Sequence, residues 1–209
     1  MTIQIHKHDL PGGLDFGTAV AIDTETQGLS LVRDKLCLVQ LSAGNGDAHI
    51  VQMDRDRYDA PNLKALLLDA AVTKIFHFAR FDVAVMQRDL GVDTHGIFCT
   101  KIASGLVRTY TDRHGLKDLT RELLGVDLSK QQQSSDWAAE ELSDAQKAYA
   151  ASDVLHLHAL RNILTARLIR EGRLDVAQSC FDFINTRCRL DLMGWDEVDI
   201  FSHRMRAVT

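Results

Sequence analysis

The order of apolar segments along this 209-residue chain predicts a three-layer α/β domain with a mixed sheet. Short β-branched segments come first, strands then alternate with helices, and only helical patterns occur from residue 101 onward. The hydrophobic fraction of 45% gives a chain of this length enough apolar material for one core. We expect one domain over residues 1–209, with a main part over about 15–170 and C-terminal helices over about 173–209.

The first three strands are expected to form a meander. Residues 18–23 (TAVAID) are apolar and β-branched, as is typical of a buried strand. Residues 36–41 (LCLVQL) and 48–51 predict two more strands. The Gly-Asn-Gly-Asp stretch at 44–47 is typical of a hairpin turn between them.

The middle of the chain is expected to alternate between helices and strands. We predict a helix over residues 62–71 and a fourth strand over 74–78. A second helix over 81–90 should end at Gly91, and a short fifth strand is expected over 97–98. The sequence therefore predicts a five-stranded sheet.

The C-terminal part is predicted to be helical. Ser143 and Gln146 have the spacing of a capping box, so we expect one long helix from Ser143 to about Glu171, ended by Gly172. A further amphipathic helix is expected over residues 176–192. The apolar residues at its end indicate an oligomer contact, with docking onto the chain's own sheet as the alternative. They are Leu190, Leu192, Met193 and Trp195.

Composition and charge exclude several classes of protein. No stretch approaches the roughly 18–20 apolar residues of a membrane span. The first ten residues lack the apolar region of a signal peptide. Four scattered cysteines without a CxxC pair indicate a reduced, cytoplasmic protein. The formal net charge of −5 argues against a protein that coats long nucleic acid, but it allows an enzyme that holds a few nucleotides in a local pocket.

Two acids stand at the end of the first predicted strand. Asp23 and Glu25 are two residues apart, so in an extended segment both carboxylates point to the same face and can share a metal ion. For an isolated pair, an acidic exit from a strand is the better explanation.

Two further acids have equally ordinary explanations when each is taken alone. Asp82 is expected in the first turn of a helix, where Asp is favoured by capping and by the helix dipole. Tyr149 and Asp153 are four residues apart on one helix face. Asp in mid-helix is a weak helix former, and the small residues around it favour a crowded interior face over a solvated one.

Together these patterns supply four carboxylates, Asp23, Glu25, Asp82 and Asp153, and one phenol, Tyr149. Four acids that converge on one point repel each other unless cations lie between them. Mg²⁺ or Mn²⁺ fits such oxygen ligands. Two such ions, roughly 3.5–4 Å apart, are an established arrangement for phosphodiester cleavage.

The order D-x-E, H-x-x-x-x-D, Y-x-x-x-D resembles the DEDD 3′→5′ exonuclease superfamily, which has a ribonuclease H-like (DnaQ-like) fold. The tyrosine four residues before the last Asp is typical of its DEDDy branch. Residues 130–137 (KQQQSSDW) and 114–119 (HGLKDL) resemble signatures of ribonuclease D. The resemblance covers roughly residues 15–170, and the combination of motifs is specific.

A smaller subgroup resembles the chain more closely. The 209 residues leave no room for the helical nucleic-acid-binding domains that follow the exonuclease domain of ribonuclease D. The stretches D-T-E-T-Q-G-L and R-D-K-L-C-L-V-Q-L resemble the small nanoRNase C-type oligoribonucleases of bacteria. This resemblance implies action on very short RNA, above all dinucleotides, and assembly into a homo-oligomeric, octameric ring.

The resemblance also implies a role for each residue of the acid cluster. Asp23, Glu25 and Asp153 would ligate one metal ion, and Asp23 and Asp82 a second. Tyr149 would orient the attacking water, and the products would be nucleoside 5′-monophosphates.

Further residues are candidates for contact with the substrate. They are Thr24, Leu29, His77, Phe81, His114, Lys117 and Gln133. Leu29 lies where relatives push an apolar side chain between two bases, although ordinary loop packing explains it equally well.

Other residues in these regions have stronger ordinary explanations. Arg108 and Lys130 lie where they can reach phosphate, with a solvated surface charge as the better explanation. Phe78 and Phe81 can line a base pocket, with the core as the better explanation. Trp137 is expected to pack rather than stack on bases.

Three alternatives remain open. One is a 3′→5′ exonuclease of the same fold that acts on longer RNA or on DNA. A second is a non-catalytic nucleic-acid-binding module, which the complete set of four carboxylates and Tyr149 disfavours. The third is a zinc site at His156 and His158, which is disfavoured because residues two apart on a helix do not face each other.

Overall fold

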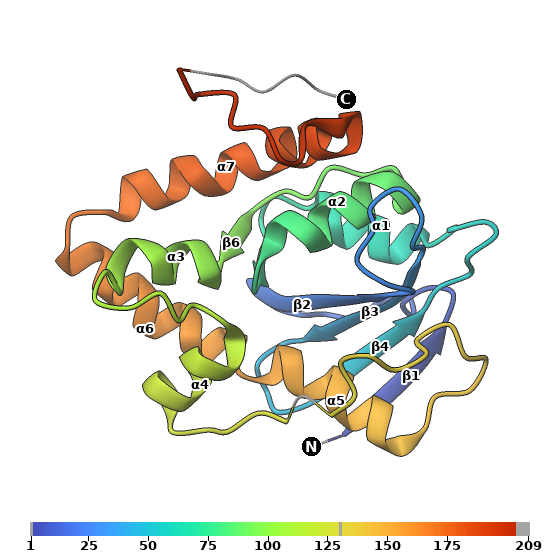
Figure 1. Cartoon of the computed structure of the whole chain (residues 1–209). Helices are drawn as coiled ribbons and strands as arrows, with labels where there is room; N and C mark the ends of the chain where they lie inside the picture. Colours follow the sequence, from blue (N-terminus) through green and yellow to red (C-terminus); the bar gives the residue numbers. More distant parts are fainter. Residues whose placement is uncertain (1, 130, 204–209) are drawn as a thin grey trace.

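The computed structural model describes residues 2–129 and 131–203 of the chain, and its centre is a mixed six-stranded sheet (Figure 1). The strand order is β1-β4-β3-β2-β5-β6. β2 and β4 run antiparallel to β3, whereas β5 and β6 continue the sheet in parallel on the other side of β2. The strands are β1 (Ile3–Lys7), β2 (Ala19–Thr26), β3 (Leu36–Ser42), β4 (Ala48–Gln52), β5 (Thr73–Phe76) and β6 (Ile97–Cys99).

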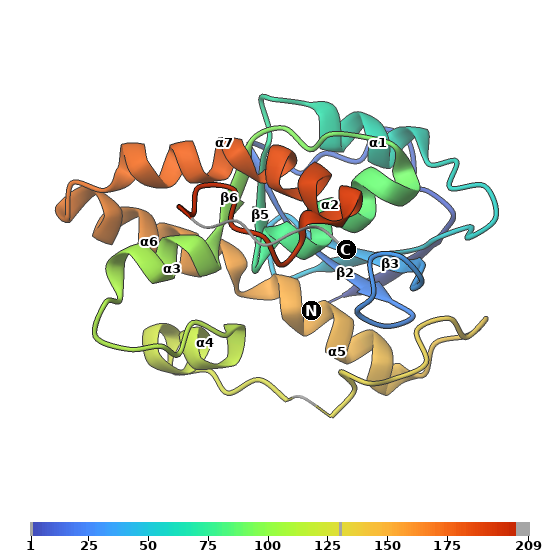
Figure 2. The ribbon, with the colours of Figure 1, turned by 45° about the horizontal axis from the view of Figure 1, so that its top comes forward.

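Helices cover both faces of the sheet, as the predicted fold class requires (Figures 1 and 2). One face carries α1 and α2, and α5 crosses the other face against β1 to β4. At one end of the sheet α3 and α4 pack on α6, and α7 runs along α2. The helices are α1 (Pro61–Leu68), α2 (Ala79–Leu90), α3 (Thr100–Val107), α4 (Leu116–Leu124), α5 (Asp144–Leu155), α6 (Leu157–Arg170) and α7 (Leu174–Leu190), followed by the π-helical turn η1 (Asp191–Trp195).

The sheet has one strand more than the sequence predicts. The unpredicted strand is β1, which pairs in parallel with β4 at the edge of the sheet. Its polar and apolar residues alternate as in a strand, but its partner lies more than forty residues away along the chain. Nothing local in the sequence indicates that pairing.

The predicted single helix from Ser143 to Glu171 is two helices. α5 ends at Leu155 and α6 begins at Leu157, with His156 at the junction (φ −102°, ψ −8°). The capping box at the start is confirmed, because Ser143 Oγ accepts a hydrogen bond from the Gln146 N–H at 3.2 Å and Gln146 Oε1 accepts one from the Ser143 N–H at 2.9 Å. The sequence pattern places Asp153 in the middle of a long helix. In the structure it lies in the last turn of α5.

In the C-terminal part of the chain, α7 packs on α2 and on the edge strand β6, and η1 docks on α2. Asp191, at the start of η1, is buried between Arg80 of α2 (2.6 Å) and Arg187 of α7 (2.7 Å). Leu192 and Met193 stay exposed beside this contact, at 36% and 69%. Among the described helices, none is long and apolar enough to cross a membrane.

Candidate functional site

The end of β2 positions the first two acids. Asp23 pairs with Gln40 of β3 and Glu25 pairs with Leu38, so both side chains lie on the face that α5 covers. Thr24, between them, points to the opposite face, where its Oγ1 donates a hydrogen bond to Asp82 Oδ1 at 2.6 Å. This contact ties the end of β2 to the first turn of α2, in which Asp82 is buried.

The last turn of α5 brings the fourth carboxylate. Ala150 and Ala151 of α5 are fully buried, and their small side chains let the helix lie close to the sheet. One carboxylate oxygen each of Asp23, Glu25 and Asp153 lie within 4.8 Å of one another. Within the described residues this is the one group of three or more potential metal ligands.

The electrostatics of the cluster favour a bound cation. Burial, and then repulsion by Asp82, Asp153 and Glu25, raises the pKa of Asp23 well above its usual range. Burial also raises the pKa of Glu25 to about 9 and those of Asp82 and Asp153 to about 7. The donor set is all carboxylate oxygen, which hard divalent cations prefer. The residues therefore fit a divalent metal site.

Tyr149 faces the cluster from one turn before Asp153. Burial, followed by the charges of Asp153 and Glu25, raises the pKa of its phenol, so the hydroxyl stays protonated at neutral pH. It donates a hydrogen bond to Asp153, which lowers the pKa of that carboxyl in opposition to burial. Its ring packs beside Trp137, with ring centroids 5.9 Å apart, and Trp137 is buried as expected.

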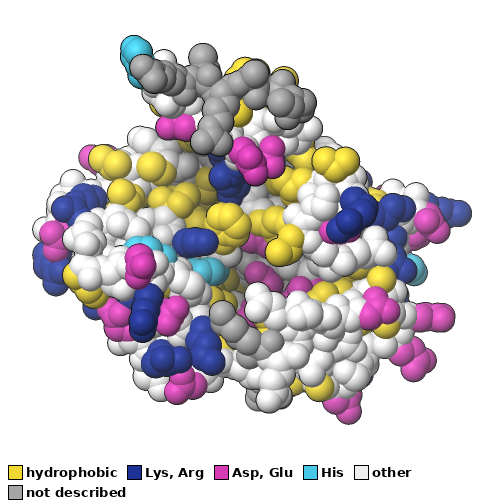
Figure 3. Space-filling view, in the orientation of Figure 1, with side chains coloured by type: hydrophobic (Ala, Val, Ile, Leu, Met, Phe, Trp, Pro, Cys, Tyr) yellow, Lys and Arg dark blue, Asp and Glu magenta, His cyan; other side chains and the backbone are white. Residues whose placement is uncertain are grey.

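A cavity of about 340 Å³ opens over the acids. Figure 3 shows this face hollowed at its centre, with acidic side chains inside and hydrophobic side chains above them. The cavity is lined by the four acids and Tyr149, together with Leu29, Phe78 and Lys101. Of the candidate substrate contacts, six line it, namely Thr24, Leu29, His77, Phe81, Lys117 and Gln133.

The remaining candidates lie elsewhere. His114 is not in the wall of the cavity, and its Nδ1 is hydrogen-bonded to Ser104 Oγ at 2.8 Å. Arg108 is fully buried and paired with Glu122, so its interpretation as a surface charge is wrong, and it does not line the cavity. Lys130 lies outside the described residues.

His77 and the zinc alternative are also placed by the structure. His77 lines the cavity with its Nδ1 2.9 Å from Thr100 Oγ1, and burial lowers its pKa to about 3, so the ring is neutral. His158 turns toward the sheet, where its Nε2 lies 3.1 Å from the Ser42 carbonyl oxygen. His156 stands at the helix junction, and neither belongs to the group of potential metal ligands.

Phe78 is not a core residue, although the sequence analysis favours the core for it. It is 43% exposed and lines the cavity, and its backbone is left-handed, with φ 69° and ψ 47°. This conformation at the junction of β5 and α2 turns the side chain outward. Lys101 Nζ lies 4.0 Å from the ring centroid, a cation–π contact that the sequence separation of the two residues hides.

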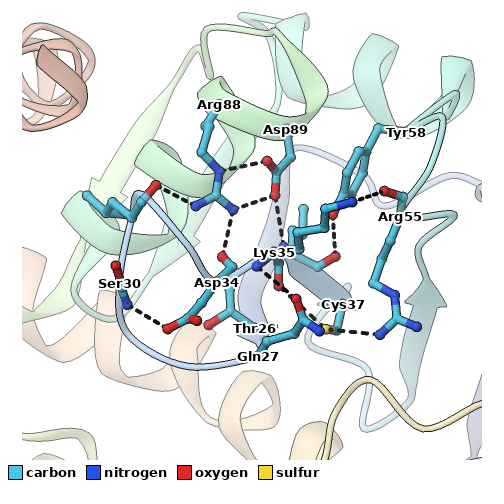
Figure 4. Close-up of polar contacts among 12 residues, drawn as sticks. Thr26, Gln27, Ser30, Asp34, Lys35, Cys37, Arg55, Tyr58, Arg88 and Asp89 are labelled. Carbon is cyan, nitrogen blue, oxygen red and sulfur yellow. Dashed lines mark hydrogen bonds and ion pairs between the residues drawn. The ribbon is translucent and has the colours of Figure 1, made fainter.

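A clamp of hydrogen bonds holds the loop that carries Leu29 (Figure 4). Arg88 of α2 donates to the Leu31 carbonyl at 2.7 Å and to the Asp34 carbonyl at 2.8 Å. Asp89 fixes the Arg88 guanidinium and accepts the backbone N–H of Leu36 at 2.8 Å. The loop is therefore held from α2, while Leu29 itself is 85% exposed beside the cavity.

The Asp34 carboxylate fills the inside of the Leu29 loop. Asp34 Oδ2 accepts the Ser30 N–H at 3.0 Å (Figure 4). Arg33 pairs with the same carboxylate at 2.6 Å. A Cβ atom at Gly28 would collide with the Asp34 carboxylate, so a larger residue there would have to displace that side chain. The clamp and this packing together tie the Leu29 loop to α2 and to the Asp34 carboxylate.

Comparison with known proteins agrees with this geometry. Residues 8–169 match the family described as 3′-5′ exonuclease. Ribonuclease D of Gluconacetobacter diazotrophicus is 40% identical over 156 residues, which is 75% of this chain and 39% of that protein. The chain thus spans about two fifths of the length of this relative.

Two solved structures match over almost the whole chain. Brucella melitensis NrnC with bound Mg²⁺ is 56% identical with a TM-score of 0.93, and Brucella melitensis NrnC bound to pGG is 56% identical with a TM-score of 0.94. Each match covers 98% of this chain and 100% of the other. The motifs, the sheet with its flanking helices and these relatives lead to one conclusion: the chain belongs to the 3′-5′ exonuclease family.

Proposed function

We propose that the protein is a two-metal-dependent 3′→5′ exoribonuclease that releases nucleoside 5′-monophosphates from short RNA, above all from dinucleotides. The observation that carries the proposal is the convergence of Asp23, Glu25 and Asp153 beside Asp82 and Tyr149 at the floor of one cavity. The binding of pGG to Brucella NrnC supports a short substrate.

The four carboxylates would hold two divalent cations, Mg²⁺ or Mn²⁺. Asp23, Glu25 and Asp153 would hold one, and Asp23 and Asp82 the other. Bound there, the cations would supply Lewis-acid stabilisation of the phosphoryl charge and lower the pKa of a coordinated water. The bound Mg²⁺ of Brucella NrnC supports this assignment.

The protein residues around the metal site would position the reactants. Tyr149 remains protonated, so its hydroxyl orients the attacking water and does not act as a strong base. Lys101 and Lys117 supply positive charge in the cavity wall for the phosphate. Thr24, His77 and Gln133 are proposed polar contacts of the substrate.

The apolar wall of the cavity would hold the bases. Leu29, Phe78 and Phe81 lie along it, and aromatic rings accept a base of any identity by stacking. Exposed Leu29 would insert between the last two bases. His114 lies outside the wall, where its Nδ1 is hydrogen-bonded to Ser104 Oγ, so we do not place it among the contacts of the substrate.

The proposal extends to assembly and location. We propose a homo-oligomer, an octameric ring, in the cytoplasm. The exposed apolar side chains of Val32 (98%), Met193 (69%) and Phe201 (78%) support contacts with further copies of the chain. A ring would restrict the entry of long substrates.

A time course on labelled RNA tests the proposed function. Two-nucleotide and seven-nucleotide RNA, with matching DNA, are incubated with Mg²⁺ or Mn²⁺ and with EDTA. We expect fast, metal-dependent cleavage of the dinucleotide RNA and slow attack on the longer strand. Equal or faster cleavage of the longer RNA or of DNA would favour the general exonuclease. No cleavage of any substrate would favour the non-catalytic binding module.

Two substitutions separate metal binding from water positioning. Asp23→Ala should abolish turnover, while the melting temperature in EDTA is unchanged or higher because repulsion among the acids is relieved. Tyr149→Phe should bind Mn²⁺ like the unmodified protein but lose about 10²-fold in kcat. Single-turnover kinetics and Mn²⁺ titration calorimetry check both. Full activity of either variant would remove that residue from the mechanism.

The stability of the metal-free protein should fall as the pH rises. The pKa values of Asp82 and Asp153 are raised to about 7 and that of Glu25 to about 9, so the folded state binds more protons than the unfolded state between their unfolded and folded pKa values. The protonated acids therefore contribute to the free energy of unfolding at low pH. This contribution is lost as the pH rises through the pKa values of the folded state. Thermal denaturation in EDTA between about pH 5 and about pH 9 should show the loss, and Mn²⁺ should remove it. A flat profile in EDTA contradicts the electrostatic account.

The clamp should act on the substrate through Leu29. Arg88→Ala removes two hydrogen bonds to the Leu29 loop and should lower kcat/KM for the dinucleotide about 10-fold, with Mn²⁺ affinity unchanged. Arg170→Ala is the control, because Arg170 is 70% exposed, pairs with Glu171 and is not part of the Leu29 loop, so it should change kcat/KM by less than about twofold. The double variant of Leu29→Ala with Arg88→Ala should have the same kcat/KM for the dinucleotide as Leu29→Ala alone. Additive losses would show that Arg88 acts by another route.

A further inference from the structure

Gln40 is a buried polar side chain with no assigned role. It lies on β3 near the middle of the sheet and is fully buried. Neither its Oε1 nor its Nε2 has a hydrogen-bond partner within the described part of the chain. A buried amide that stays unpaired costs free energy, so a hydrogen-bond partner is expected within reach of this side chain.

The register of the sheet places Gln40 beside the acid cluster. Gln40 is directly opposite Asp23 in the antiparallel pair of β2 and β3. Opposed residues share one face of the sheet, with Cβ atoms about 4.5–5.5 Å apart. The same face is covered by α5, which carries Asp153. The Gln40 amide is therefore within side-chain reach of the Asp23 carboxylate.

Two other acids of the cluster already have side-chain donors. Asp82 accepts a hydrogen bond from Thr24, and Asp153 accepts one from Tyr149. Carboxylates that ligate metals are in turn hydrogen-bonded, and such partners orient the ligand and tune its affinity. The proposed function assigns Asp23 to both cations, so the orientation of its carboxylate affects both metal sites.

We propose that Gln40 is a positioning residue for the metal site, with its Nε2 donating a hydrogen bond to the Asp23 carboxylate when divalent cations are bound. This inference rests on the metal sites of the proposed function. It also fixes the orientation of the amide, because only the Nε2 end can donate.

The test compares metal binding with metal-free stability in Gln40→Met, which keeps the length of the side chain and removes its polar atoms. Mn²⁺ affinity is measured by titration calorimetry, and thermal denaturation is followed in EDTA and in Mn²⁺. We expect Mn²⁺ affinity to fall 10- to 100-fold. In EDTA the variant should melt at or above the temperature of the unmodified protein, because an unpaired buried amide has been removed. Gln40→Leu should behave in the same way.

Ser42→Ala is the matched control. Ser42 lies two residues further along β3 on the same face, is fully buried, and donates to the Asp47 carbonyl at 2.7 Å. It pairs with Ala21 and not with an acid. This variant should melt at a lower temperature in EDTA, with unchanged Mn²⁺ affinity.

Two results would overturn the inference. One is Mn²⁺ affinity of Gln40→Met within about twofold of the unmodified protein, given the 10- to 100-fold loss expected for such partners. The other is unfolding of both Gln40 variants in EDTA, since the amide would then serve the metal-free fold. If the unmodified protein itself binds no Mn²⁺, the proposed metal-dependent function fails together with the role of Gln40. If the unmodified protein binds Mn²⁺ and Gln40→Met binds it equally well, only the role of Gln40 fails.

Discussion

Mutual repulsion among four carboxylates is the constraint on which the rest of the structure depends. Asp23 and Glu25 come from the end of β2, Asp82 from the start of α2 and Asp153 from the end of α5. The fold must hold these three elements at one point against the charge of their side chains. The small side chains of Ala150 and Ala151 and the hydrogen bond from Thr24 to Asp82 are what make this approach geometrically possible.

Helix α2 connects the two halves of the site. Its first turn carries Asp82 in the acid cluster, and its last two turns carry Arg88 and Asp89, which hold the Leu29 loop. One acid of the cluster and the residues that hold the Leu29 loop are therefore carried by the same helix. A helix tilt that moved Asp82 would also move the loop, so the floor and the wall of the cavity keep a common geometry.

The local patterns of the sequence predicted most of this fold. β2, β3 and β4 were found from short apolar runs, and the start of α5 from the capping box at Ser143. β1 was missed because its parallel partner β4 is distant in the sequence. The break at His156 was missed because the helical pattern of the two segments is continuous.

The site was predictable where spacing sets geometry. The D-x-E pair and the Tyr149–Asp153 spacing placed side chains on common faces, and the structure brings them together. Side-chain direction outside regular elements was not predictable. Phe78 turns outward because of a left-handed backbone, and Arg108 is buried because Glu122, fourteen residues on, neutralises it.

The left-handed backbone of Phe78 has an evolutionary consequence. A bulky residue in this conformation is strained by about 1–3 kcal/mol, and glycine would relieve that strain. Glycine would also remove the ring that walls the cavity and faces Lys101. Stability and the proposed contact with the substrate therefore favour different residues at this position. Under the proposed function, glycine at position 78 would therefore give a more stable protein that holds the substrate base less well.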